Sequence, residues 1–403
     1  MKYSNSIKSA MCKLGIEKLR PKQGQAISSI LKGHDTMVIA PTSFGKSLLY
    51  LIPAIIRSDA LTFIVEPLIA LMHDQVKYLQ EHGIAAAYLD HTQNAEEQVD
   101  IMEQLRHGRV HILFVSPERL VSMRFQVEIK DIPIGMIVVD ECHCVISWGS
   151  TFREAYLHIG EFVKSLPRHP VIVAVTATAH PDDRLNIMEL LSMDSDAKIF
   201  TYRLYRGNLT FVIKRVNTRK EKLNKLKKAL NKYHKNTTII FCATKVEAEE
   251  VAKKIKDKYH NDVVVYHSQN KKQEKNILSG KKHIIVATTA LSMGVDIRNV
   301  DLVIHFDMPT SLEDYYQQAG RGGREGEHSR SILLYDPMDY TRYYGLIKET
   351  LNKDAGKRAI KHLDQIKELC EDKHHCIVKL LLNGLGDSHE KACRYCTNCQ
   401  KKR

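Results

Sequence analysis

Short apolar runs rich in β-branched residues alternate along this chain with stretches in which apolar residues recur every three or four positions. The short runs predict buried β-strands, and the recurring pattern predicts amphipathic helices. In the first half of the chain the predicted strands are residues 36–39, 62–65, 112–115, 136–139 and 171–175. Strands that are apolar on both faces need cover on both sides. The alternation therefore indicates a parallel sheet between two layers of helices.

The same alternation returns in the second half, where the predicted strands are residues 238–241, 263–265, 284–286, 302–304 and 332–334. After residue 345 helical patterns replace it, and the chain finishes in a segment rich in cysteine. We therefore predict an α/β fold with two tandem parallel-sheet domains and a small helical domain. The expected domains are residues 1–205, 206–345 and 346–403, and the chain length of 403 residues suits two or three domains.

Basic residues outnumber acidic ones, 60 to 47, which gives a net charge of +13. This excess fits a polyanionic partner and a solvated basic surface equally well. Lysine is densest in residues 214–235, which we place between the two sheet domains, and there Leu223, Leu226 and Leu230 keep one apolar stripe. The favoured interpretation is a surface helix with a solvated basic face, and a surface that tracks phosphates is the alternative.

No apolar run is long enough to span a bilayer, since the longest, residues 48–56, contains Pro53 and is followed by Arg57. The amino terminus lacks the apolar core of a signal peptide. We expect an intracellular protein, cytoplasmic and nucleoid-associated in a bacterium or nuclear in a eukaryote. In such a compartment the nine cysteines are expected to be free thiols or metal ligands and not disulfides.

Residues 40–47, Ala-Pro-Thr-Ser-Phe-Gly-Lys-Ser, join a predicted strand to an apolar helical run. Strand, loop and helix in this order are the setting of a phosphate-binding loop, whose backbone amides cradle the phosphates. Lys46 would reach the outer phosphates and the Ser47 hydroxyl would ligate magnesium, while Thr42 and Gly45 would surround the nucleotide. A structural turn with a helix cap is the alternative.

Asp140 and Glu141 follow a predicted buried strand. Two carboxylates at the carboxyl end of such a strand suit a magnesium-bound nucleotide. Asp140 would hold the ion, and Glu141 would polarise the attacking water. The only tryptophan, Trp148, follows closely, and then Phe152 and Arg153. Flat rings beside a cation suit an unpaired, stacked base, so this one segment combines nucleotide chemistry with a possible nucleic-acid contact.

Arg321 and Arg324 lie in the glycine-rich residues 319–324 of the second sheet domain. The planar fork of an arginine grips phosphate oxygens and stabilises the negative charge that spreads in the transition state. If both arginines reach a nucleotide held by the first domain, hydrolysis requires the two domains to close. A solvated basic loop is the alternative.

Sixteen, two and two residues separate four cysteines near the end of the chain, Cys376, Cys393, Cys396 and Cys399. Four thiolates can close a tetrahedral zinc site, and two-residue gaps let consecutive ligands turn toward one ion. Because no ligand position stays open, the zinc would be structural. Free or redox-active thiols are the alternative, and His375 could replace one ligand in a variant site.

These motifs resemble those of the RecQ family of helicases, and the resemblance runs nearly end to end. It implies two RecA-like domains, a zinc module and hydrolysis of ATP with magnesium. Residues 19–23, Leu-Arg-Pro-Lys-Gln, are similar to the family's adenine-reading motif, which places Gln23 on the base and Arg20 near it. Gln317, which precedes the two arginines, is expected at the nucleotide as well. The residues for which the resemblance implies contact with DNA are His143, Trp148, Phe152, Arg153 and Thr178.

The chain departs from the family pattern at several positions. Glu66 stands where a small polar residue is usual, Ser43 and Phe44 replace two glycines of the phosphate loop, and Thr151 replaces an aspartate. The chain ends at Arg403, so the winged-helix domain of larger family members, and the small helical domain that often follows it, have no counterpart in this sequence. We expect either a short natural member or a truncated form.

The leading hypothesis is an ATP-dependent DNA helicase or translocase that moves 3′ to 5′ on single strands, as a monomer, in DNA repair or recombination. Single-stranded DNA and tailed duplex DNA are its expected partners. One alternative is an RNA helicase of a related group. Another is a nucleic-acid-binding or annealing module whose affinity is modulated by ATP.

Overall fold

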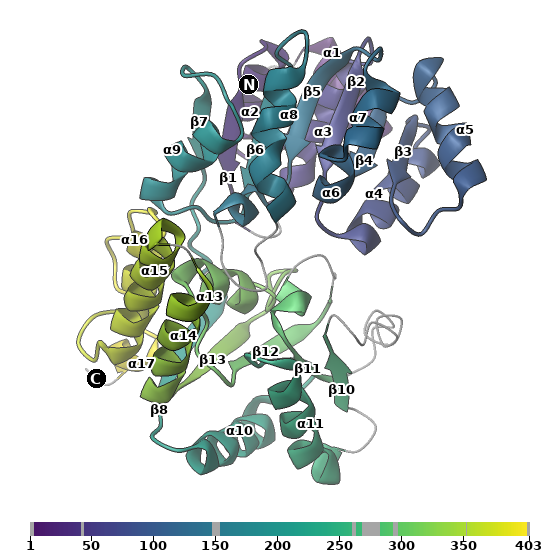
Figure 1. Ribbon diagram of the computed structural model, residues 1–403. Helices are drawn as coiled ribbons and strands as arrows, with labels where there is room; N and C mark the ends of the chain where they lie inside the picture. Colours follow the sequence, from purple (N-terminus) through teal and green to yellow (C-terminus); the bar gives the residue numbers. More distant parts are fainter. Residues whose placement is uncertain are drawn as a thin grey trace. The chain divides into compact units, whose positions relative to one another are not determined.

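The computed structural model describes residues 4–41, 44–146, 154–259, 263–267, 283–292, 297–351 and 353–400 (Figure 1). They form two compact units, the first extending to Arg203 and the second beginning at Leu204. Within these residues, no helix combines the length and the apolar character that a bilayer crossing requires.

A parallel sheet of seven strands forms the centre of the first unit, as far as the structure describes it. In spatial order the strands are β3 (Ala86–Leu89), β4 (Ile112–Val115), β2 (Leu61–Val65), β5 (Ile134–Val139), β6 (Val171–Thr176), β1 (Thr36–Ile39) and β7 (Lys198–Thr201). Strands β1, β2, β4 and β6 are buried along their whole length, because helices cover the sheet (Figure 1).

The helices of the first unit connect these strands in the order that the sequence pattern predicts. They are α1 (Asn5–Lys13), α2 (Gln23–Leu31), α3 (Lys46–Ile56), α4 (Ile69–Glu81), α5 (Ala95–Arg106), α6 (Pro117–Leu120), α7 (Met123–Ile129), α8 (Ile159–Ser165) and α9 (Pro181–Leu190), with the 3-10 helices η1 (Cys142–Val145) and η3 (Glu154–His158). Local sequence fixes several helix starts. Before α5, the Asn94 side chain accepts from the Glu97 amide at 2.9 Å, and the Glu97 carboxylate accepts from the Asn94 amide at 2.8 Å.

The second unit is built on another parallel sheet, of six strands among the described residues. Their spatial order is β10 (Val263–Tyr266), β11 (Ile284–Ala287), β9 (Thr237–Phe241), β12 (Val300–His305), β13 (Ser329–Tyr335) and β8 (Leu209–Arg215). The helices are α10 (Arg219–Tyr233), α11 (Lys245–Tyr259), α13 (Leu312–Ala319), α14 (Pro337–Thr350), α15 (Lys353–Glu371), α16 (Ile377–Gly384) and α17 (Thr397–Gln400), with the 3-10 helix η5 (Thr289–Ser292).

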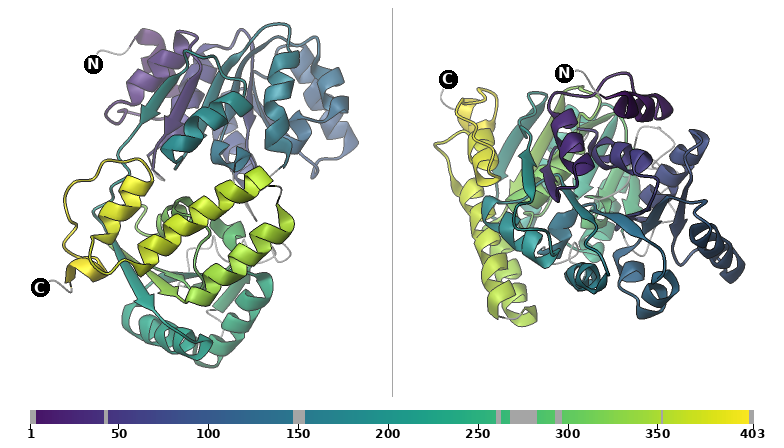
Figure 2. Two further views of the ribbon diagram at one scale, coloured as in Figure 1. Left: turned by 60° about the vertical axis from the view of Figure 1, so that its left-hand side comes forward. Right: turned by 90° about the horizontal axis from the view of Figure 1, so that it is seen from above.

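Helices α14 and α15 pack side by side within the second unit (Figure 2). Phe211 of β8, Leu333 of β13, Leu363 of α15 and Leu381 of α16 belong to one hydrophobic cluster. The carboxyl-terminal helices therefore share a core with the second sheet. The boundary that the sequence predicts between the second and third domains, at residue 345, falls within α14. The predicted domain limits therefore stay a proposal.

The predicted fold class is confirmed, and each of the ten predicted strands is present. Sequence patterns missed β3, β7 and β8. The alanines of β3 carry little strand signal, and β7 leaves most of its side chains exposed. The placement of residues 214–235 between the domains was wrong, because β8 pairs with β13 along seven residues and α10 packs on the same sheet.

Candidate functional site

The predicted phosphate loop leads from β1 into α3. Gly45 caps α3 with φ of +82°, a left-handed conformation that glycine adopts without a steric penalty. Lys46 is therefore the first residue of α3, where the orphan backbone amides and the helix dipole favour phosphate. Ser47 follows in the same turn. Thr42, also predicted to bind the nucleotide, lies outside the described residues.

Gln23 is buried next to this loop, and both the oxygen and the nitrogen of its side-chain amide form hydrogen bonds. Its Nε2 donates to the carbonyl oxygens of Phe44 at 3.0 Å and Gly45 at 3.3 Å. Its Oε1 accepts from the Arg20 amide at 2.7 Å. Gln23 thus supports the predicted phosphate loop through its backbone, while the contact of Gln23 with the base stays a prediction. The bulky Phe44 packs on Tyr202, with ring centroids 4.3 Å apart.

The acidic pair lies at the carboxyl end of β5, as the sequence indicates. Asp140 is buried, and its Oδ2 accepts from the Tyr50 hydroxyl at 3.1 Å while its Oδ1 accepts from the Glu141 amide at 2.8 Å. Lys46 Nζ lies 3.7 Å from Glu141 Oε1. The folded unit thus brings together the lysine of one motif and a carboxylate of the other, which lie about 95 residues apart in the chain.

Glu66 adds a third carboxylate to this region. It follows β2, and since Val65 pairs with Val139 in the parallel ladder, Glu66 and Asp140 leave neighbouring strands at the same level. Glu66 is fully buried, and its Oε1 accepts from the Leu68 amide at 3.2 Å. Burial raises the pKa of Glu66 well above its ordinary value, and the charges of Asp140 and Glu141 raise it further.

Burial and the Glu141 carboxylate likewise raise the pKa of Asp140, against the opposing charge of Lys46. A divalent cation held by Asp140 and Ser47 would offset this crowding of negative charge. Oxygen ligands of this kind are those that magnesium prefers, so the residues fit the ion.

A hydrogen-bonded route leads from the acidic pair to the end of β6. His143 Nδ1 lies 3.3 Å from Glu141 Oε2 and 3.0 Å from Thr176 Oγ1. The Thr176 hydroxyl in turn donates to the Thr178 carbonyl oxygen at 2.9 Å. His143 and Thr178 are both buried, and their predicted contacts with DNA stay predictions. Trp148, Phe152 and Arg153, predicted to meet the strand, lie outside the described residues.

The arginine-bearing loop of the second unit follows α13. Gln317 and Arg321 are buried, and Arg324 is half-buried. Gly323 has φ of +59°, and a Cβ there would stand 2.4 Å from the Glu327 carbonyl oxygen, so glycine is required.

Two residues that sequence patterns missed hold this loop. Arg206 donates to the carbonyl oxygens of Gly320 at 2.9 Å and Gly322 at 3.0 Å, and also to that of Gly323. Asn208 Nδ2 donates to the Gly323 and Glu327 carbonyl oxygens, both at 2.8 Å. We call this arrangement the Arg206 clamp. No local motif marks Arg206, because its partners lie more than a hundred residues later.

The four predicted zinc ligands converge. The sulfur atoms of Cys376, Cys393, Cys396 and Cys399 all lie within 4.8 Å of one another. Cys376 and Cys396 have their sulfurs 4.0 Å apart. A tetrahedral site with zinc–sulfur bonds of about 2.3 Å places its sulfurs about 3.8 Å apart, so the donor set fits zinc.

Three family models match the chain in order. They are a DEAD/DEAH box helicase over residues 20–186, a helicase conserved C-terminal domain over residues 221–326, and a RecQ zinc-binding model over residues 337–400.

Curated relatives match almost the whole chain. The ATP-dependent DNA helicase RecQ of Bacillus subtilis is 33% identical over 396 residues, which cover 96% of this chain and 66% of that protein. The probable ATP-dependent DNA helicase RecS of the same organism is 31% identical, over 94% of this chain and 76% of the relative. A protein of Acanthamoeba polyphaga mimivirus, whose name assigns it provisionally to the ATP-dependent RNA helicases, is 31% identical over 96% of this chain and 70% of its own length. This chain spans 60 to 66% of the length of the three RecQ relatives that it matches.

Solved structures share the fold at lower identity. The DEAD-box helicase Mss116 bound to single-stranded RNA and UDP-BeF has a TM-score of 0.70 at 17% identity, covering 97% of this chain and 88% of that one. The DUF1998 helicase MrfA bound to DNA has a TM-score of 0.67 at 22% identity, covering 86% of this chain and 53% of that one.

Proposed function

Since this chain belongs to the RecQ family of helicases, we propose that it is an ATP-dependent DNA helicase or translocase. It moves 3′ to 5′ along single-stranded DNA, acts on single strands and on duplexes with single-stranded tails, and works in DNA repair or recombination. The observation that carries the proposal is the meeting of Lys46 with Glu141 beside the buried Asp140.

The chemistry follows from the character of these groups. Lys46 binds the outer phosphates of ATP at the start of α3, and Asp140 with Ser47 would hold the magnesium ion. When bound, that ion neutralises charge on the phosphate oxygens. Glu141 orients the attacking water, while Arg321 and Arg324 stabilise the charge that develops on the transferred phosphoryl group. Arg20, Gln23 and Gln317 complete the nucleotide contacts.

Coupling between DNA and hydrolysis follows the route from Glu141 through His143 to Thr176 and Thr178. A DNA strand that contacts the segment around Trp148, Phe152 and Arg153 shifts these hydrogen-bonded side chains. The Glu141 carboxylate, which orients the water, moves with them. The contacts of His143 with Glu141 at 3.3 Å and with Thr176 at 3.0 Å support the proposal, because they connect the proposed catalytic carboxylate directly to the end of β6.

The test is a titration of ATPase activity with single-stranded DNA, combined with single-turnover unwinding of a 3′-tailed duplex. Strand-stimulated hydrolysis and displacement of the 3′-tailed substrate are expected. Lys46→Ala abolishes both, because it removes the group that holds the outer phosphates. Hydrolysis that is equally fast with and without DNA contradicts the coupling. Displacement of a 5′-tailed duplex alone contradicts the polarity.

An RNA helicase is the second candidate. The mimiviral relative, whose name points to RNA, covers as large a share of this chain as the RecQ proteins do. Comparing stimulation by DNA and RNA strands of matched length and sequence decides between the two. An annealing module without unwinding would bind strands tightly and leave the tailed duplex intact.

A further inference from the structure

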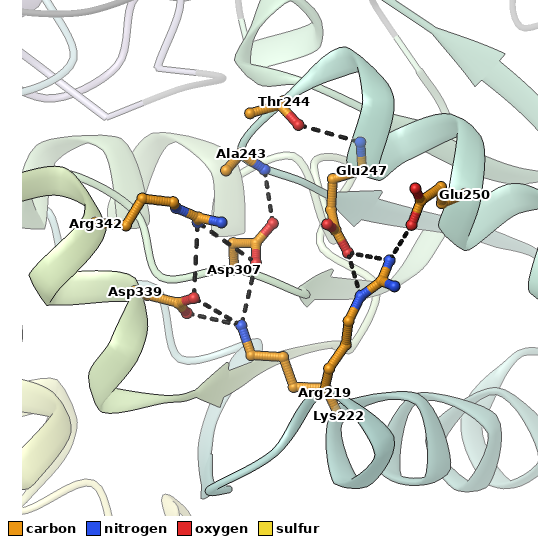
Figure 3. A network of polar contacts seen from close by, with 9 residues as sticks. All are labelled: Arg219, Lys222, Ala243, Thr244, Glu247, Glu250, Asp307, Asp339 and Arg342. Carbon is orange, nitrogen blue, oxygen red and sulfur yellow. Dashed lines mark hydrogen bonds and ion pairs between the residues drawn. The ribbon is translucent and has the colours of Figure 1, made fainter. Parts of the chain in front are cut away.

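Lys222 points into the second unit from α10, a helix whose lysines otherwise favour the surface. It is only 4% exposed, and its Nζ lies 3.1 Å from Asp307 Oδ1 and 2.8 and 2.9 Å from the two carboxylate oxygens of Asp339 (Figure 3). Burial by itself lowers the pKa of Lys222, but the charges of Asp307 and Asp339 outweigh it and raise that pKa. Lys222 therefore stays charged, because a buried ammonium group remains protonated only when it is paired with opposite charge.

Both carboxylates also bind backbone amides. Asp307 Oδ2 accepts from the Ala243 amide at 2.8 Å, at the first turn after β9. Asp339 Oδ2 accepts from the Met308 amide at 3.0 Å, in the loop after β12. Arg342 of α14 lies 3.7 Å from Asp307 and 3.6 Å from Asp339, so two cations balance two anions (Figure 3). We call Lys222, Asp307, Asp339 and Arg342 the Lys222 network.

The network joins four parts of the chain that are distant in sequence. They are α10, the loop after β9, the loop after β12, and α14, which leads into the zinc-binding helices. The two loops share the wall of a cavity of about 150 Å³, to which Cys242, Ala243, Met308 and Thr310 contribute. The cavity lies at the carboxyl ends of β9 and β12, the edge at which parallel α/β sheets bind their ligands.

Stability alone is a weak explanation for this arrangement. A buried ion pair is weak evidence for stability, since apolar replacements of similar volume often serve as well. Here each carboxylate also accepts from a loop amide, so the network fixes where the two loops lie relative to each other.

We propose that Lys222 is a positioning residue that holds the loops after β9 and β12 in the relative positions needed to bind the nucleic-acid strand. The inference rests on the proposed function, because it takes the strand as the ligand of this edge. Asp339 and Arg342 belong to α14, so the start of this helix and the two loops are held by one set of charges.

The experiment compares Lys222→Met with Lys228→Met in the full chain. The two variants make the same chemical change on the same helix, but Lys228 is exposed. For Lys222→Met, the concentration of a single-stranded oligonucleotide that gives half-maximal ATPase stimulation rises about tenfold or more. The hydrolysis rate without DNA and the affinity for a fluorescent ATP analogue stay within about twofold, since the nucleotide groups of the first unit are untouched. Lys228→Met matches the parent.

A second variant, Asp339→Asn, keeps the size of the side chain and removes one charge. It raises the half-maximal DNA concentration in the same direction, and it provides the measurement if Lys222→Met does not fold. Unchanged half-maximal concentrations in folded Lys222→Met or Asp339→Asn overturn the inference. An equal loss of DNA-independent hydrolysis also overturns it, because it indicates general damage. If no strand stimulates the parent protein, the proposed function itself fails.

Discussion

Arg206→Ala tests whether the arginine loop depends on a residue outside the nucleotide motifs. The guanidinium of Arg206 donates to three carbonyl oxygens of the loop, at 2.9 and 3.0 Å for Gly320 and Gly322, and with a further bond to Gly323. A hydrogen bond to a charged donor contributes about 1.5–3 kcal/mol. Because one half-buried side chain makes all three bonds and water can replace some of them, we expect the three Arg206 bonds together to contribute about 2–4 kcal/mol.

Two consequences follow for the variant. The second unit, of about 200 residues, loses roughly 5–15 °C of melting temperature, since 1 kcal/mol corresponds to about 2–4 °C in a unit of this size. The maximal rate of DNA-stimulated ATP hydrolysis falls by about 100-fold, because an arginine displaced by 1 Å from a transferring phosphate costs about that factor. The affinity for a fluorescent ATP analogue changes little, because the main ligands proposed for the nucleotide belong to the first unit.

The assay is steady-state ATPase with saturating single-stranded DNA, at a temperature well below the melting point of the variant. Arg203→Ala is the matched control, since Arg203 is exposed and has no hydrogen bond or ion pair among the described residues. A double-mutant cycle with Arg321→Ala completes the test. If the Arg206 clamp acts through Arg321, the double variant is no slower than Arg321→Ala alone. A folded Arg206→Ala protein with the parent's rate, or losses that multiply, would refute the reasoning.

Glu66→Gln makes the protein more stable at pH 8 in the absence of divalent cations. The raised pKa means that folded Glu66 binds a proton which the unfolded chain releases above about pH 4.3, so stability falls as pH rises beyond that value. Thermal melts with a chelator from pH 4 to pH 9 measure the difference, which shrinks toward pH 4; a variant less stable at pH 8 contradicts it. Cys396→Ser loses the bound zinc and lowers the melting temperature by roughly 10 °C or more, because metal binding contributes to folding. Elemental analysis of the purified protein checks this against Cys12→Ser, an exposed thiol outside the cluster; an unchanged zinc content rules out the ligand assignment.

Local patterns in the sequence were sufficient for the fold class and for the position of the main motifs. A run of apolar residues predicts a buried segment from only a few positions. A glycine-lysine pair shortly after such a run predicts the start of a helix. Lys46, Asp140 and the four cysteines were found in this way, since each motif carries its chemistry in a short segment. The same reasoning failed for β7, whose exposed side chains give no apolar period.

The sequence by itself determined two parallel sheets, the strand–loop–helix setting of the predicted phosphate loop, an acidic pair and a cysteine cluster, because period and spacing are local properties of the chain. Only the tertiary structure decided which distant groups meet. Glu66 lies beside Asp140 because β2 and β5 are neighbours, and a strand order is not written in any single strand. Lys222 looks like one surface lysine among many until α10 is packed, and only then do Asp307 and Asp339, 85 and 117 residues away, become its partners. Charge pairing over such separations depends on the topology that the whole chain adopts, so residue patterns identify the groups and the fold assigns their partners.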